Sequence, residues 1–366
     1  MIADRRTRLL GIDLCRGIAA YAVVLVHCGD ETWGVPISDV AIQFRLMFYF
    51  AVPFFLAAAF YFLTRKPVID LSPRFWRSRI ERIVIPYVIW SVIYLIVRSL
   101  FFLVADKPDR LSGLFQDPLA LVFLGSASFQ LYFLPLLLAG TSLLVLAKYL
   151  IEHKIGLLAL VVFISISVAI NGIIDATGNG FQLGEGIAFS SILQWVPKGV
   201  TYEIARIILV ELVWIIRCLP YAFGALILHH LLSRLEIFQN RSKRLTFLFI
   251  GLFLITATIG KVWLPQSLQD VLVAYFLLIA GILGSNSLKD NKFVASLGAC
   301  SFGIYLIHPI PMNFSKGLIV KVFPALSQQV SIASMLIFSI SGFLLSWLLV
   351  SLLIRNKMIA KYIFGS

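Results

Sequence analysis

The sequence predicts an all-α fold: a polytopic integral membrane helical bundle of about ten transmembrane helices, with both termini in the cytoplasm. Of its 366 residues, 60% are hydrophobic and only 13% are charged, which is far from the balance of a soluble domain. The mean hydropathy is +0.94. Apolar stretches close to the roughly 20 residues that cross a bilayer recur along the chain without a linker between them. We therefore expect residues 1–366 to form one membrane-embedded domain, with no fused soluble domain.

The expected helices follow from these stretches, and an even number of them places both termini on one side of the membrane. With that topology, 20 basic residues fall on the side of the termini and 6 on the opposite side. Because Lys and Arg collect in cytoplasmic loops, the termini are expected in the cytoplasm, and the net charge of +13 does not indicate nucleic-acid binding. The segments lie at about 10 to 28, 43 to 64, 83 to 105, 129 to 147, 155 to 172, 206 to 228, 245 to 262, 268 to 285, 293 to 312 and 331 to 354.

The first segment carries two ionisable side chains, Arg16 and His27. Eleven residues are close to three helical turns, so the two side chains are expected on one face, roughly 16 Å apart along the helix axis. Ionisable groups inside a membrane span are costly and usually functional. A neutral imidazole suits proton transfer near neutral pH, although an interfacial histidine bound to water is the alternative for His27. Asp13, three residues before Arg16, is placed to pair with it.

A second cluster, Arg74 to Tyr87, lies at the cytoplasmic start of the third segment. Most basic loops there only anchor the helix at the membrane surface. Arg79 and Arg82, however, are one helical turn apart and could together hold phosphate oxygens. The cluster is therefore a candidate site for an anionic cytosolic ligand.

Two later segments also carry polar side chains. In the sixth, Arg217, Tyr221 and Gly224 fall within about 40° of one another beside a proline, and Glu211 is offset around the same helix. Pairing of these charges with neighbouring helices and binding of a ligand both remain open. In the ninth, Tyr305 and His308 are one turn apart near the outer side. The four cysteines fall within or at the ends of spans, so we predict no structural disulfide: Cys15, Cys28, Cys218 and Cys300.

Taken together, these stretches resemble the membrane acyltransferase-3 family, which O-acylates sugars of bacterial surface and secreted glycans. Asp13 to Gly17 followed by His27 resembles its Asp-x-x-Arg-Gly start and its Arg-x10-His pair. Arg79 to Arg82 is similar to its Arg-x-x-Arg, Arg217 to Gly224 to its later Arg- and Gly-containing helix, and Ser301 to Pro309 to its Ser-Phe-Gly-x-Tyr-Leu-x-His-Pro signature. The matches occur in the expected order over most of the chain.

The chain departs from the family pattern at two places. Phe54 to Ala59 reads Phe-Phe-Leu-Ala-Ala-Ala, where many members have Ser-Gly after Phe-Phe. Leu131 to Phe133 reads Leu-Tyr-Phe in place of Leu-Trp-Phe. Helix packing and substrate preference at these places are therefore not carried over from the family.

The resemblance implies an O-acetyltransferase of the bacterial inner membrane that uses acetyl-CoA or another acyl-CoA, with no metal and no permanently bound cofactor. Its expected partners are acyl-CoA, a glycan or lipid-linked oligosaccharide, membrane lipids and glycan-assembly proteins. We expect the CoA phosphates on Arg79, Arg82 and Arg16. His27 is then the general base on a sugar hydroxyl or carries the acyl group covalently. Asp30 and Glu31 are candidates to orient its ring.

Three further arginines lie toward the outer side in the expected topology: Arg45, Arg98 and Arg206. They are candidates to receive an acidic acceptor, and the alternative is that they anchor helix ends at the membrane interface. A transporter or flippase of a lipid-linked saccharide, and a non-catalytic scaffold for glycan assembly, are the competing functions. The arginine pair on the third segment and the aligned Arg16 and His27 favour an enzyme over a transporter. The number of charges inside the membrane disfavours a scaffold.

Overall fold

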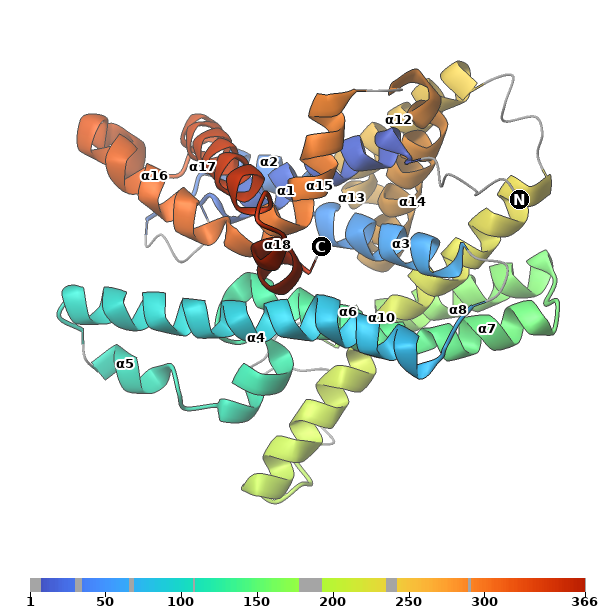
Figure 1. Cartoon of the computed structure of the whole chain (residues 1–366), viewed down its shortest axis with the longest axis horizontal. Helices are drawn as coiled ribbons and strands as arrows, with labels where there is room; N and C mark the ends of the chain where they lie inside the picture. The colour runs from blue at the N-terminus through green and yellow to red at the C-terminus, as the bar shows by residue number, and fades with distance from the viewer. Residues whose placement is uncertain are drawn as a thin grey trace. The chain divides into compact units, whose positions relative to one another are not determined.

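The computed structural model describes residues 8–29, 35–65, 69–107, 109–177, 193–234, 242–288 and 291–365. Nearly all of these residues are helical, and the only β pairing among them is an isolated bridge between Ile37 and Val330. The longer helices are labelled in Figure 1. They are α1 (Leu10–His27), α2 (Asp39–Leu46), α3 (Ala51–Thr64), α4 (Pro73–Val104), α6 (Phe133–Thr141), α7 (Leu143–Glu152), α8 (Leu157–Ala176), α10 (Val200–Arg234), α12 (Ser242–Thr258), α14 (Gln266–Gly284), α15 (Lys292–Ile307), α16 (Pro309–Val322), α17 (Ile332–Leu353) and α18 (Lys357–Phe364).

Short helical segments connect several of these helices. They are α5 (Asp109–Gly113), the π-helical turn η2 (Ala120–Leu124), the 3₁₀ turn η3 (Phe129–Tyr132), α13 (Gly260–Trp263), and the 3₁₀ turns η4 (Ser285–Leu288) and η5 (Pro324–Ser327). The segment α5 folds back beside the end of α4 (Figure 1).

The predicted membrane-spanning segments correspond to helices of the structure. Within the described residues, eight helical stretches are long and apolar enough to cross a membrane, and α15 with α16 forms a ninth that is bent by 76°. The remaining predicted segment, 245 to 262, corresponds to α12, which has 17 residues. The chain is therefore a polytopic helical membrane protein, as its composition predicts. The expected position of both termini in the cytoplasm remains a prediction from the charge distribution.

Two helices differ from their predicted bounds for reasons visible in the sequence. The third segment is predicted from residue 83, but α4 already begins at Pro73 because the Ser72 side chain accepts a hydrogen bond from the Phe75 N–H and a proline occupies the first helical position. The ninth is predicted as one helix over 293 to 312, but it breaks at His308. Pro309 disfavours the continuation of a straight helix through the residue before it.

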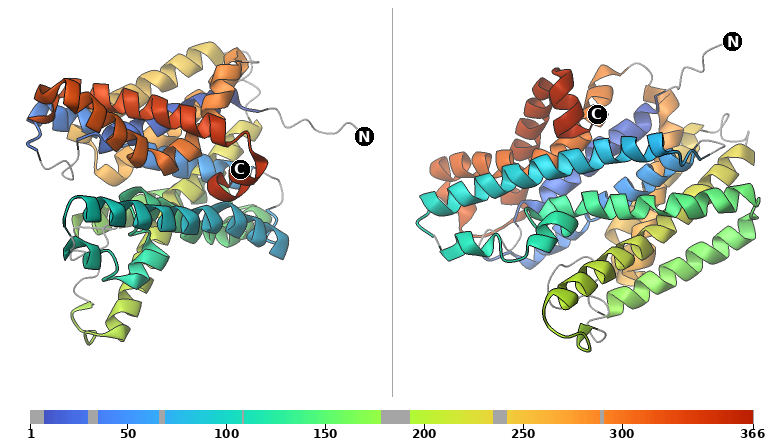
Figure 2. Two further views of the ribbon diagram at one scale, coloured as in Figure 1. Left: turned by 60° about the vertical axis from the view of Figure 1, so that its left-hand side comes forward. Right: turned by 60° about the horizontal axis from the view of Figure 1, so that its bottom comes forward.

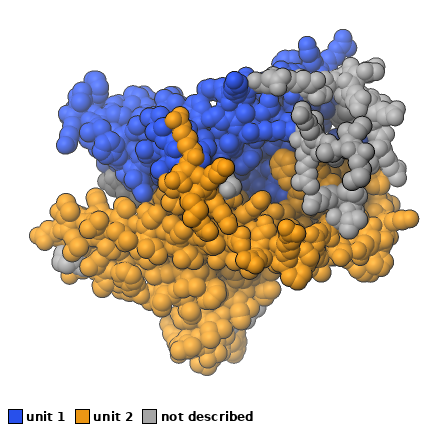
Figure 3. Space-filling view, viewed as in Figure 1, with its two compact units in different colours: residues 1–59, 231–265, 269–354 blue, residues 60–230, 266–268, 355–366 orange. Residues whose placement is uncertain are grey.

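The chain divides into two compact units, which are coloured separately in Figure 3. The first comprises residues 1–59, 231–265 and 269–354, and the second comprises residues 60–230, 266–268 and 355–366. Each unit has its own buried apolar side chains, and each is described by itself below.

Unit 1 is built around α1, which packs against α15 and α17. The helix α1 also approaches α14, so closely that a Cβ on Gly11 would overlap the carbonyl oxygen of Gly281. The Gly11 N–H donates to Ser285 Oγ (3.0 Å), which in turn donates to the Gly281 carbonyl (2.7 Å). Small residues let helix backbones approach in this way within a membrane. In the same unit α16 and α17 run side by side (Figure 2).

Unit 2 contains α4, which contacts α6, η3 and α18. The Trp90 indole N–H donates to the carbonyl of Ile363 (3.0 Å), and Phe364 of α18 is buried. Gly140 of α6 lies against Cys218 of α10. All four cysteines, Cys15, Cys28, Cys218 and Cys300, are described and buried, and none of them forms a disulfide.

Candidate functional site

The helix α1 runs without a break from Leu10 to His27, so Arg16 and His27 lie on one face of it, as predicted. His27 is the last residue of the helix, and the Arg16 side chain is about one-third exposed (33%). The axial separation of eleven residues is roughly 16 Å. The structure therefore places the imidazole at the end of one continuous helix and the guanidinium about three turns before it.

His27 lies against His308, the second histidine of the sequence motifs. The two rings are stacked, with centroids 5.6 Å apart and planes 25° apart. His308 is fully buried (0% exposed), and its Nδ1 lies 2.8 Å from the carbonyl oxygen of Tyr305. A carbonyl oxygen only accepts, so Nδ1 carries the hydrogen and Nε2 carries the lone pair of the neutral ring. The structure thus brings together the histidine that ends α1 and the histidine at the break between α15 and α16.

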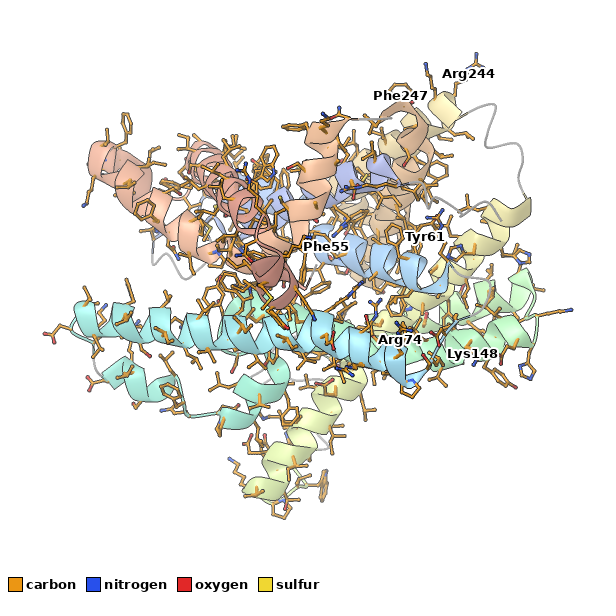
Figure 4. The ribbon with its side chains drawn as sticks, viewed as in Figure 1. Phe55, Tyr61, Arg74, Lys148, Arg244 and Phe247 are labelled. Carbon is orange, nitrogen blue, oxygen red and sulfur yellow. The ribbon has the colours of Figure 1, made fainter. Side chains whose placement is uncertain are left out.

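Tyr305 connects this pair to α3. It is 2% exposed, and its ring lies 6.3 Å from that of His308 and 6.3 Å from that of Phe55, which is labelled in Figure 4. Phe55 belongs to the Phe-Phe-Leu-Ala-Ala-Ala run that departs from the family pattern. The second phenylalanine of this run, which directly precedes the departure, therefore lies next to the buried Tyr305.

The turn after His27 is held by Arg45 of α2. Arg45 Nη1 donates to the carbonyl of Gly29 (3.1 Å). Gly29 has φ +112°, and a Cβ there would overlap the Val330 side chain, so only glycine fits this position without strain. Asp30 and Glu31, the candidates to orient the His27 ring, lie outside the described residues.

Asp13 lies between two arginines, Arg16 of α1 and Arg8, which is the first described residue. It forms an ion pair with Arg8 and lies 3.7 Å from Arg16 Nη1, and it is 7% exposed. A Cβ on Gly298 of α15 would overlap Asp13. The predicted pairing of Asp13 with Arg16 is therefore present, and it neutralises part of the charge that α1 carries inside the protein.

Arg79 and Arg82 lie on α4, in unit 2. The Arg79 guanidinium sits over the Phe75 ring, 5.2 Å from its centroid, and Arg82 is exposed. Figure 4 labels Arg74 near the start of the same helix. Gly365, with φ +63°, packs against the backbone of Arg82, so the end of α18 lies beside this arginine.

Arg206 and Arg217 of α10 are both paired with carboxylates. Arg206 donates to Asp117 (2.5 Å) and Glu203 (2.7 Å), and Arg217 pairs with Asp175 of α8. Pairing is the usual way in which membrane proteins keep a charge inside a helical bundle. These two contacts favour a structural role for both arginines, one of the two alternatives left open by the sequence.

One polar face of α4 was not predicted from the sequence. Tyr87, Ser91, Tyr94 and Arg98 recur at the i, i+4, i+7, i+11 positions of α4 and so lie on one side of it. This spacing was visible in the sequence, but the side chains are separated by apolar residues that dominate a hydropathy profile. Two hydrogen bonds connect this face to the broken segment that precedes α6. Tyr87 donates to the Leu121 carbonyl of η2, and Arg98 donates to the Ala127 carbonyl between η2 and η3.

These features define a polytopic helical membrane protein with a histidine pair and charged side chains inside its units. A family model described as an acyltransferase domain matches residues 9–351, so the chain belongs to the membrane acyltransferase-3 family and is a membrane acyltransferase. No curated protein and no solved structure matches the chain closely enough to add to this assignment. Among the residues that the structure describes, no group of three or more His, Cys, Asp or Glu side chains is arranged to hold a metal ion.

Proposed function

We propose that the protein is an O-acyltransferase of the bacterial inner membrane that moves an acyl group, most commonly acetyl, from cytosolic acyl-CoA to a sugar hydroxyl of a surface, secreted or lipid-linked glycan. Family membership supports acyl transfer. The observation that carries the rest is the position of His27 at the end of an unbroken helix, stacked on the buried His308. A histidine held in this way is suited to proton transfer.

In the proposed reaction, the sugar hydroxyl oxygen attacks the thioester carbonyl while His27 takes the hydroxyl proton. The C–S bond then breaks, the proton passes from His27 to the leaving thiolate, and an ester and free CoA thiol are formed. Transfer through an acyl-histidine at His27 gives the same products in two steps. His308 is a positioning residue in either route, because its fixed ring limits how the His27 ring can turn.

The donor phosphates are assigned to Arg79 and Arg82 of α4, in unit 2, and Arg16 of α1, in unit 1, stays a separate candidate from the sequence. Arg82 is exposed and Arg79 is held over Phe75, so the pair offers guanidinium groups to an anionic ligand. The roughly 16 Å between Arg16 and His27 suits an extended pantetheine arm along α1.

Of the arginines proposed to face the acceptor, Arg206 is engaged by two carboxylates and Arg45 by the Gly29 carbonyl. Both contacts support the anchoring alternative for these two residues. Arg98 differs from them, because its hydrogen bond is to the backbone of a broken helix.

The proposal is tested with purified full-length protein in lipid nanodiscs, labelled acetyl-CoA and candidate glycans, followed by chemical identification of the acylated product. We expect a labelled sugar ester from the native chain and a loss of about 10²- to 10⁴-fold in rate for His27→Ala, the usual range for a lost general base. Full acyl transfer by a normally folded His27→Ala variant contradicts the assignment of this residue. Movement of a lipid-linked saccharide across the bilayer without any ester supports the transporter instead.

A further inference from the structure

The helical segments before α6 are interrupted inside unit 2. The π-helical turn η2 ends at Gly125, which has φ +76° and lies so close to Tyr132 that a Cβ there would overlap its backbone nitrogen. The chain then forms the 3₁₀ turn η3 before α6 begins. Gly125, Ala127 and Ser128 are buried. Irregular backbone within a membrane bundle is tolerated where it is buried in protein or lines a site, and broken helices commonly form the substrate sites of membrane proteins.

The polar face of α4 meets this segment at three points. The Tyr87 hydroxyl donates to the Leu121 carbonyl (2.6 Å) and accepts from the Gly125 N–H (3.0 Å). Arg98 Nη1 donates to the Ala127 carbonyl (3.0 Å). The Tyr94 side chain is hydrogen-bonded to that of Gln130. Three side chains of one helix therefore converge on the stretch where the next helix is broken.

Gln130 of η3 belongs to this arrangement through its hydrogen bond with Tyr94. It is 1% exposed, and its Oε1 accepts a hydrogen bond from the buried Ser128 hydroxyl (2.6 Å). A primary amide offers both donors and an acceptor, as does each hydroxyl of a sugar. A buried amide of this kind is costly in an apolar bundle unless its polar groups are used.

The helix α10 adds an acid and an aromatic donor to the same place. Trp214 lies 6.5 Å from the Tyr132 ring and is 0% exposed, and its buried indole N–H has no hydrogen-bond partner within the part of the chain that the structure describes. Buried indole N–H groups nearly always find an acceptor. Glu211, one turn earlier on α10, lies within electrostatic range of Tyr87. The cluster thus contains a buried donor with no acceptor among the described residues.

The arginine of this cluster differs in its partner from the arginines at the other polar sites of unit 2. Arg206 and Arg217 each pair with a carboxylate, whereas Arg98 forms no ion pair among the described residues. The cluster holds amide, hydroxyl, guanidinium and carboxyl groups beside aromatic rings. These groups match a ligand ring that carries several hydroxyls around an apolar face.

We propose that the face of α4 formed by Tyr94 and Arg98, the broken segment with Gln130 and Tyr132, and Trp214 of α10 bind the saccharide ring of the acceptor. This proposal rests on the proposed function, because it names the part of unit 2 that takes the sugar. Gln130 and Arg98 hydrogen-bond ring hydroxyls, Tyr132 packs on the ring face, and the Trp214 N–H donates to a sugar oxygen.

The test measures binding without catalysis. The full-length protein in nanodiscs, free of glycoside detergents, is titrated with the methyl glycosides of glucose, galactose and N-acetylglucosamine while tryptophan fluorescence is followed. We expect a saturable change with at least one glycoside that Trp214→Phe abolishes. Gln130→Leu and Arg98→Gln should weaken the affinity about tenfold or more. Asn171→Leu is the matched control, since Asn171 is a buried polar residue of α8 that donates to the Ile216 carbonyl, outside the cluster.

Two further measurements separate binding from structure and from the proposed function. In steady-state transfer assays, Gln130→Leu should raise the acceptor KM about tenfold, whereas the control Asn171→Leu should leave the acceptor KM unchanged. Unchanged glycoside affinity in Gln130→Leu and Arg98→Gln, or an equal loss in Asn171→Leu, overturns the subsite. Glycoside binding that depends on Gln130 in a protein that transfers no acyl group supports the subsite and rejects the acyltransferase chemistry proposed above.

Discussion

The imidazole rings of His27 and His308 are stacked at 5.6 Å, and the second ring is fixed by its own backbone contact to the Tyr305 carbonyl. His308 comes from the point where α15 breaks before Pro309, so the same bend that interrupts the helix aims this ring. The contact between the two rings suggests a structural role for the Tyr-Leu-Ile-His-Pro stretch. It supplies a rigid surface against which the histidine of α1 is held.

The first prediction concerns His308. His308→Phe preserves an aromatic ring of similar size but removes the Nδ1–H donor to Tyr305, so the ring loses the bond that fixes its plane. We expect kcat to fall about tenfold or more, as for a lost buried hydrogen bond, while the KM for acyl-CoA is unchanged. Steady-state kinetics with varied acyl-CoA measure both values.

The control for this variant is His153→Phe. His153 has the same local contact, with its Nδ1 2.9 Å from the Tyr149 carbonyl, but it is exposed at the end of α7. It should leave both kinetic values unchanged. A normal kcat in His308→Phe shows that the stacked ring does not position His27.

The second prediction concerns Arg45, which holds the turn that follows His27. Arg45→Gln shortens the side chain and removes the donor to the Gly29 carbonyl, so the end of α1 becomes less ordered. We expect kcat to fall about three- to tenfold, from the loss of roughly 0.5–1.5 kcal/mol of hydrogen-bond free energy, with little change in acceptor KM. Gln43→Ala, at an exposed position of the same helix, is the control. A large rise in acceptor KM with normal kcat assigns Arg45 to acceptor binding instead.

Sequence reasoning predicted the parts of this fold that follow from local pattern. The apolar segments, the common face of Arg16 and His27, and the pairing of Asp13 with Arg16 all follow from helix geometry over short spacings. The partners of Arg206 and Arg217 could not be predicted in the same way, because Asp117 and Asp175 come from other elements. The contact between His27 and His308 also depends on how α1 packs on α15. These long-range contacts are set by packing, which the spacing of residues along the chain does not encode.

The broken segment before α6 also could not be predicted from the sequence. Hydropathy placed the fourth span at 129 to 147, and the structure begins its helical stretch at Phe129, as predicted. The π-helical turn and the positive φ of Gly125 precede it. A lone glycine in an apolar stretch does not distinguish a break from a close helix contact, so the polar site around Gln130 became visible only with its partners in place.

The third prediction concerns the ion pair between Arg217 and Asp175. Both side chains are largely buried, with 10% and 26% exposure. Removing one partner leaves a charge without its counterion, so Arg217→Leu or Asp175→Leu should each destabilise the protein by about 3–5 kcal/mol. The double variant Arg217→Leu with Asp175→Leu should be less destabilised than the sum of the two, because it leaves no isolated charge.

Thermal unfolding of the purified variants in nanodiscs, followed by circular dichroism, gives this comparison. Additive losses in the double variant indicate that the two residues act independently. A near-normal stability of the single variants together with lost activity moves Arg217 from the structural alternative to the ligand-binding one.

The last prediction concerns the end of α18, which lies beside the proposed donor site. Gly365 has φ +63° and packs on the backbone of Arg82, and the Trp90 indole N–H holds the Ile363 carbonyl. Gly365→Val introduces both backbone strain and an overlap with the Arg82 carbonyl, so α18 should detach from α4. We expect the KM for acyl-CoA to rise about tenfold, equivalent to roughly 1.4 kcal/mol of binding free energy, with a smaller change in kcat.

Trp90→Phe provides a milder test, because it removes only the indole donor and should raise the KM for acyl-CoA about threefold. Gly199→Val is the matched control, since Gly199 also has a positive φ (+140°) but has no atom within reach of an added Cβ. Limited proteolysis reports whether α18 has detached. If proteolysis shows a detached α18 while the KM for acyl-CoA stays normal, the donor phosphates do not depend on the position of Arg82. In that case Arg16 and Arg79 are the residues to vary next, because they are the remaining basic groups assigned to the donor.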